Sequence, residues 1–123
     1  MMAESRMLSA EPTGRVPLPT WVVDKHPDIF GFEAAGGGMS RVIPDGATVM
    51  VEPCDKPKNG DIVVVELPDG EGYVRRWHRG QDTLMLSADG YEEREDMVFK
   101  GEEIDDLILL GKVVWFQASG EVR

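Results

Sequence analysis

The sequence of 123 residues has few of the residues that form disulfides and metal sites: one cysteine, Cys54, and two histidines, His26 and His78. A single cysteine cannot close a disulfide within the chain, and one cysteine with two histidines falls short of the usual zinc ligand sets. We therefore expect no metal, no cofactor and a reducing, cytoplasmic setting. The two histidines are expected at the surface, and the thiol is expected to be a small, half-buried side chain.

Long apolar runs are missing as well. Residues 1–6 lack the apolar stretch of a secretory signal, and the longest apolar runs, such as Leu107–Leu110, are far too short to span a bilayer. The chain is therefore expected to be a soluble intracellular protein with no membrane partner.

Basic residues are scarce: 13 Lys and Arg face 23 Asp and Glu, which gives a formal net charge of −10. A protein that holds nucleic-acid phosphates needs a basic face, so direct nucleic-acid binding by this chain alone is not expected. The basic run Arg75–Arg79 is too short to change that expectation. Between Glu92 and Asp106 there are eight acidic and two basic residues, for which a solvated loop is expected and a site for a basic partner is the alternative.

The residues in good supply favour β structure. Hydrophobic residues make up 41% of the chain, which is enough for the core of one domain. From residue 29 onward, short β-prone runs alternate with turn signals such as Pro44-Asp45-Gly46 and Asn59-Gly60, and no segment shows a sustained helical repeat. These runs predict antiparallel or mixed strands at Ile29–Ala35, Ala47–Glu52, Asp61–Leu67, Tyr73–His78, Thr83–Ser87 and Leu107–Gln117.

The chain is expected to divide into three parts. Residues 1–28 are expected to be a flexible arm or linker, because Pro12, Gly14, Pro17 and Pro19 interrupt any periodicity. Residues 29–119 are expected to form the β domain, and residues 120–123 a short tail.

The most informative stretch is Gly36–Pro53, a glycine-rich approach followed by Met39, Ser40 and an amphipathic strand. The glycines alone do not predict a nucleotide site, because the helix and the Lys-Ser/Thr pair of a phosphate-binding loop are missing. Together with four later blocks, however, the stretch resembles the self-cleaving domain of LexA, UmuD and phage CI-type repressors, in the signal peptidase superfamily. The later blocks are Asn59–Val65, Gly72–Trp77, Leu84–Tyr91 and Ile108–Val114, and the resemblance covers residues 30–117.

This resemblance implies a mostly β, LexA C-terminal-like fold of several coiled antiparallel or mixed sheets with a small barrel-like core. It also implies a peptidase site in which a serine attacks the peptide bond and a lysine takes the serine's proton. The serine position is Gly38 here, and the lysine position is Arg75, 37 residues further on. Glycine has no nucleophile, and a guanidinium stays protonated near neutral pH. We therefore expect no functional catalytic residue at Gly38 and Arg75 or at the neighbours Met39 and Ser40.

An alternative nucleophile remains open. Ser40 lies two positions beyond Gly38, on the same face of an extended chain, and would replace the missing serine if a base approached it. His78 and Lys112 are the candidate bases. A nucleophile and its base must lie within hydrogen-bond reach, so an ordinary polar turn residue is the expected role of Ser40.

Arg75 raises a separate question. If its side chain points into the former cleft, the buried guanidinium requires a carboxylate or several carbonyls, because an unpaired buried charge is costly. Asp45, Glu33 or a late acidic residue would serve. The functional alternative is that the cleft now binds an acidic or carboxylate-ended peptide.

The resemblance also bears on function. Self-cleaving relatives carry an Ala-Gly or Cys-Gly bond ahead of the domain, and residues 1–29 contain neither. No helix-turn-helix precedes the domain, so a free-standing domain like UmuD or a C-terminal piece of a repressor is expected. We expect a catalytically inactive peptidase domain that forms a homodimer and binds a protein partner in transcriptional control of the prophage repressor type or in the SOS response. The alternatives are an active serine peptidase with a rearranged site and a UmuD-like accessory subunit of a translesion polymerase.

Overall fold

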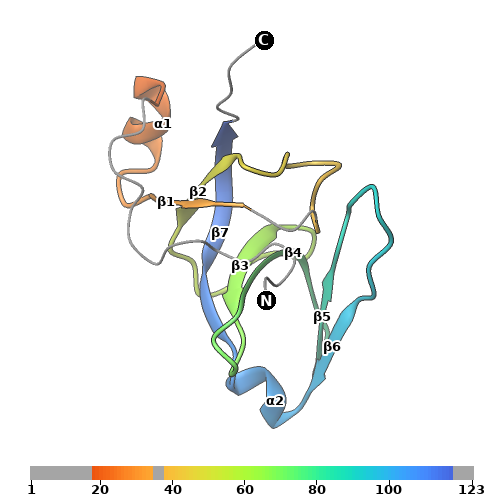
Figure 1. The fold of residues 1–123 in the computed structure, drawn as a ribbon. Coiled ribbons are helices and arrows are strands. Elements are labelled where there is room, and N and C mark those ends of the chain that lie inside the picture. Colours follow the sequence, from red (N-terminus) through yellow and green to blue (C-terminus); the bar gives the residue numbers. More distant parts are fainter. Residues whose placement is uncertain (1–17, 35–37, 118–123) are drawn as a thin grey trace.

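A computed structural model describes residues 18–34 and 38–117 (Figure 1). Residues 1–17, 35–37 and 118–123 lie outside the described part. No helix in the described part is long and apolar enough to cross a membrane. The elements are α1 (Thr20–Lys25), β1 (Phe30–Glu33), β2 (Thr48–Glu52), β3 (Ile62–Glu66), β4 (Gly72–Arg79), β5 (Thr83–Ser87), β6 (Met97–Lys100), α2 (Glu102–Asp105) and β7 (Ile108–Gln117).

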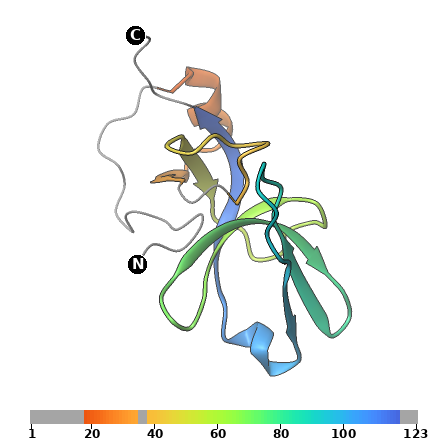
Figure 2. The same cartoon turned by 45° about the vertical axis from the view of Figure 1, so that its right-hand side comes forward.

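The seven strands of the described residues form a single sheet in the order β1-β2-β7-β3-β4-β5-β6, and every neighbouring pair is antiparallel. The mostly β prediction is confirmed. The strands join one open sheet rather than the several sheets and small barrel-like core expected, because the ten residues of β7 pair with β2 on one side and with β3 on the other. The sheet is strongly twisted: β1 lies across the view of Figure 1, whereas β5 and β6 run down it (Figures 1 and 2).

Two hydrophobic clusters occupy the two faces of the sheet, and β3 contributes to both. Val64 belongs to the first cluster, with Phe32, Met39 and Val74 among its members. Val63 and Val65 belong to the second cluster, with Leu84 and Leu86. Successive side chains of a strand point to opposite faces, so a run of three buried valines supplies both cores at once.

The structure adds three elements that the sequence did not predict. Strand β6 and helix α2 lie within the acidic segment Glu92–Asp106, so the expectation of a loop there was wrong for both, although all eight acidic residues are exposed. Helix α1 lies within the range assigned to the arm and buries Val22. The two helices have six and four residues, too few to show a helical repeat in the sequence.

Gly111 allows β7 to approach β2 closely. A Cβ atom at this position would meet the carbonyl oxygen of Glu52 and would lie 2.8 Å from Cγ1 of Val51. Both residues belong to β2, whose register with β7 shifts between Met50 and Val51. The sheet therefore needs a residue without a side chain where β7 turns from one partner strand to the other.

Gly111→Ala is expected to destabilise the domain by about 2–4 kcal/mol, because the added methyl group must push the two strands apart. Gly70→Ala is the matched control, because Gly70 also has a positive φ, +87°, but a Cβ atom added there would have no other atom within 4 Å. The control should cost about 1 kcal/mol, the cost of φ strain alone. Urea unfolding followed by tryptophan fluorescence measures both values, and equal losses would show that the close approach is not what requires glycine at position 111.

Candidate functional site

Arg75 lies in the middle of β4 and is fully buried, with a relative exposure of 0%. Its Cα partner on β3 is Val63. Its neighbours on the same face of β4, Tyr73 and Trp77, pack against the second cluster, whereas Val74 belongs to the first. Side chains therefore alternate between the two faces along β4, and this alternation directs the guanidinium of Arg75 towards the interior.

The guanidinium of Arg75 is a buried cation that contacts a backbone carbonyl and an aromatic ring. Its Nη1 donates a hydrogen bond to the carbonyl oxygen of Val74 at 2.9 Å, and its Cζ lies 5.2 Å from the centroid of the Tyr73 ring. Burial, and secondly the positive charge of Arg94, lower the pKa of Arg75 to about 10. The group therefore stays protonated at neutral pH. Arg94 belongs to the loop after β5. Its effect on the pKa of Arg75 could not be predicted from the sequence, because the two residues lie in different elements.

Gly38 and Met39 are buried, and they begin a tight turn. The carbonyl oxygen of Met39 accepts hydrogen bonds from the N–H groups of Val42 and Ile43, at 2.9 and 2.7 Å. The Gly38 carbonyl oxygen accepts a bond of 2.8 Å from the N–H of Asp89. Gly38 is thus held by its backbone against the loop that follows β5.

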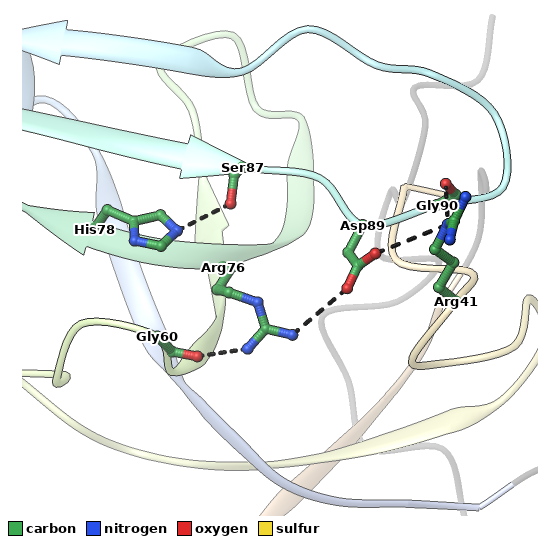
Figure 3. Close-up of polar contacts among 7 residues, drawn as sticks. All are labelled: Arg41, Gly60, Arg76, His78, Ser87, Asp89 and Gly90. Atoms are coloured by element: carbon green, nitrogen blue, oxygen red, sulfur yellow. Dashed lines mark hydrogen bonds and ion pairs between the residues drawn. The ribbon is translucent and has the colours of Figure 1, made fainter.

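Ser40 has a structural contact at this point. Its Oγ accepts a hydrogen bond from the N–H of Tyr91 at 2.9 Å. His78, one candidate base, has its Nε2 3.1 Å from Oγ of Ser87 (Figure 3). Lys112, the other, lies on β7 opposite Glu52. Within the described residues no hydrogen bond joins Ser40 to either candidate base.

We call residues 38–41 and 89–91 the clamp. Besides the bonds of Gly38 and Ser40, the N–H of Arg41 donates to the carbonyl oxygen of Asp89 at 3.0 Å, and Nε of Arg41 donates to the carbonyl oxygen of Gly90 at 3.0 Å. The guanidinium of Arg41 also lies over the ring of Tyr91, 5.4 Å from its centroid. The clamp joins two segments that are about fifty residues apart in the chain.

Asp89 connects the clamp to β4. Its carboxylate lies 4.0 Å from Nε of Arg41 and 3.8 Å from Nη2 of Arg76 (Figure 3). Arg76 in turn donates from Nη1 to the carbonyl oxygen of Gly60 at 2.7 Å. Arg76 follows Arg75 on β4 and points to the opposite face, so one short stretch of β4 carries the buried cation on one side and supports the clamp on the other.

The other residues singled out in the sequence have ordinary roles. His26 has its Nδ1 2.8 Å from Oε2 of Glu52, so it connects the end of α1 to β2 rather than lying freely at the surface as expected. Cys54 is half-buried and not in a disulfide, in agreement with expectation. In the described part of the chain, no three His, Cys, Asp or Glu side chains form a group that would hold a metal ion.

Comparison with known proteins gives consistent matches. A family model described as Peptidase S24-like matches residues 2–114. The LexA repressor of Geobacillus sp. (strain WCH70) is 31% identical over 99 residues, which are 80% of this chain and 45% of that repressor. The LexA repressors of Geobacillus kaustophilus (strain HTA426) and Leuconostoc citreum (strain KM20) are each 30% identical, over 82% and 85% of this chain and 46% and 47% of their own length. The chain therefore spans about half the length of the curated relatives it matches.

If Ser40 serves the clamp, Ser40→Ala should destabilise the domain by about 1 kcal/mol, because the N–H of Tyr91 loses its acceptor. Ser87→Ala is the matched control: it removes a hydroxyl that bonds the His78 ring, which can turn to water, and should cost less than about 0.5 kcal/mol. Chemical denaturation of both variants measures the difference. A loss no larger for Ser40→Ala than for Ser87→Ala would contradict the structural role.

Proposed function

The chain belongs to the Peptidase S24-like family, and we propose that it is a catalytically inactive member. In this proposal it acts by dimerisation and protein interaction, either in transcriptional control of the prophage repressor type or in the SOS response. The observation that carries the proposal is the pair of residues at the former dyad, Gly38 and a fully buried Arg75. The relatives that match are LexA repressors, and this chain corresponds to about half of each.

The chemistry of the two positions supports inactivity. Gly38 offers no oxygen to attack a carbonyl. Burial lowers the pKa of Arg75 only to about 10, so it cannot take a proton near neutral pH, where a general base needs a pKa close to the working pH. The remaining hydroxyl nearby, that of Ser40, accepts a bond from the Tyr91 N–H.

The purified protein is expected to show no specific chain scission during prolonged incubation at alkaline pH, and no labelling by a fluorophosphonate probe that reacts with activated serines. Mass spectrometry of the intact protein measures both. Ser40→Ala is the comparison variant, because it lacks the one candidate nucleophile of the rearranged site. Specific cleavage or labelling that disappears in Ser40→Ala would favour the alternative, an active serine peptidase with a rearranged site.

Exposed apolar side chains support dimerisation. Trp21 and Val23 of α1 are 57% and 43% exposed, and Phe116 near the end of β7 is 37% exposed. Trp21 packs edge to face on Trp115, with ring centroids 5.4 Å apart, so α1 lies beside the end of β7. Phe116 follows Trp115 and points to the other face of the strand. We call Trp21, Val23 and Phe116, the exposed apolar side chains at this end of the sheet, the apolar patch. Exposed aromatic residues are typical of protein interfaces.

The protein is expected to sediment as a homodimer at tens of micromolar, and Phe116→Glu should weaken self-association by about tenfold or more, because it places a charge in the apolar patch. Ile108→Glu is the matched control: Ile108 is 53% exposed but lies at the other end of the same strand. Sedimentation equilibrium of the three proteins measures the effect. A monomeric parent protein, or equal weakening by both variants, would contradict dimerisation through the apolar patch.

The accessory-subunit alternative differs from the leading proposal only in the partner. A domain of this family that assists a translesion polymerase would use the same fold and the same loss of catalysis. Affinity capture from the native host followed by identification of the bound proteins separates a polymerase from a transcription factor. We place either activity in the cytoplasm, where a chain with Cys54 as its only cysteine keeps a reduced thiol.

A further inference from the structure

Strand β6 forms one edge of the sheet, because it pairs with β5 and with no other strand among the described residues. The opposite edge is β1, in which Gly31 and Phe32 are buried. In β6, by contrast, every second residue is exposed, and Val98 is 54% exposed. The β6 edge is therefore the more accessible of the two.

The backbone of β6 presents hydrogen-bonding groups to this open side. In an antiparallel ladder, residues alternate between pairs that exchange hydrogen bonds and pairs that do not. The N–H of Gly101 donates to the carbonyl oxygen of Asp82 at 3.1 Å, and the register places Phe99 and Met97 in the following bonded pairs. The N–H and C=O of Val98 therefore point away from β5, to the open edge.

Lys100 is the next residue of β6 whose backbone groups should point away from β5, and its hydrogen bond supports this direction. The N–H of Lys100 donates to Oε1 of Glu103 in α2 at 2.8 Å, which is possible only if it also faces the open edge. Helix α2 thus closes one end of the edge, and Val98 lies at its open centre.

Negative charge surrounds this edge. Glu92, Glu93, Glu95 and Asp96 precede β6, and Glu102, Glu103, Asp105 and Asp106 follow it; all eight are exposed. Within the described residues, only Glu92, which lies 4.0 Å from Arg94, and Glu103, which accepts from Lys100, have an ion pair or a side-chain hydrogen bond. The segment carries most of the net charge of the chain, so the edge would attract a basic segment and repel an acidic one.

We propose that the open edge of β6 binds a basic, extended segment of a partner protein by strand addition. The backbone groups of Val98 would supply ladder hydrogen bonds, and lysine or arginine side chains of the added strand would face the surrounding carboxylates. This surface is separate from the apolar patch: β6 and α2 lie at the lower right of Figure 1, whereas α1 and the end of β7 lie at the top. The inference therefore goes beyond the proposed function and does not depend on dimerisation.

The probe is a fluorescein-labelled heptapeptide of alternating lysine and valine, compared with a peptide of equal charge in which every valine is replaced by proline. Proline cannot donate a ladder hydrogen bond, so the second peptide keeps the electrostatic attraction and loses strand addition. Fluorescence anisotropy with the full chain should show binding at least about tenfold tighter for the lysine-valine peptide. Amide NMR shifts confined to β6 and its flanks, residues 95–101, would confirm the location. Equal affinity of the two peptides, or shifts elsewhere on the sheet, would overturn the proposal.

Two sets of variants test the two parts of the recognition. Val98→Pro removes the outward N–H without removing a bond to β5, and should abolish the preference for the lysine-valine peptide. Glu95→Gln, Asp96→Asn and Glu102→Gln together should weaken binding by about fivefold or more. Asp24→Asn, Asp28→Asn and Asp55→Asn form the matched control, since they change the net charge equally at exposed positions outside this segment and should weaken binding by less than about twofold.

Circular dichroism establishes that each variant is folded. If Val98→Pro fails to fold, the NMR mapping and the two peptides still decide, because both use the unchanged chain. Unchanged peptide preference in a folded Val98→Pro, or equal weakening by the two charge sets, would overturn strand addition at β6.

Discussion

The double pairing of β7 is the constraint on which the rest of the structure depends. Strands β1 and β2 form one end of the sheet and β3 to β6 the other, and among the described strands β7 is the one that pairs with both ends. At Gly111, the backbone of β7 comes so close to Glu52 that no side chain fits. The backbone hydrogen bonds of the clamp hold the turn after β1, which carries Gly38 and Met39, against the loop after β5. Gly111 therefore allows β7 to join the two ends of the sheet, and the clamp connects them a second time.

On the proposed assignment of Arg75 to the lysine position of the family, burial of this side chain does not supply a catalytic base. A buried site lowers the pKa of a cationic side chain, which is how a lysine becomes a base near neutral pH. The same burial acts on Arg75, but the pKa of a guanidinium is ordinarily far higher than that of an ammonium group, and burial lowers it only to about 10. Desolvation lowers the pKa of Arg75, as it would lower that of a lysine, but the ordinary pKa of a guanidinium is too high for the lowered value to approach neutral pH. The side chain instead contributes its packing, with Tyr73 against its guanidinium and a backbone carbonyl as acceptor.

Much of this organisation could be predicted from the sequence, and what could not has physical reasons. The strands with alternating valines and the Asp-Gly and Asn-Gly turns are local signals, and they located six of the seven strands of the described residues. The assignment of Gly38 and Arg75 to the dyad positions rests on the order of the motifs and stays a prediction. The clamp was not predictable, because Ser40 and Asp89 meet only when distant segments are folded together. Strand β6 was missed because four residues among many acidic ones do not show a hydrophobic period.

The uneven distribution of charge separates two kinds of association on one small domain. Two copies that approached each other through β6 would bring two dense sets of carboxylates within a Debye length of about 8–10 Å, so self-pairing at this open edge is opposed by like-charge repulsion. The apolar patch of Trp21, Val23 and Phe116 lies at α1 and the end of β7, away from β6, and no dense set of carboxylates among the described residues opposes self-pairing there. The acidic residues therefore do more than solubilise a loop: they protect an exposed strand edge against a second copy of the chain while leaving it open to a partner of opposite charge. Selectivity of this kind requires no change in the fold, only the placement of charge around four residues of backbone.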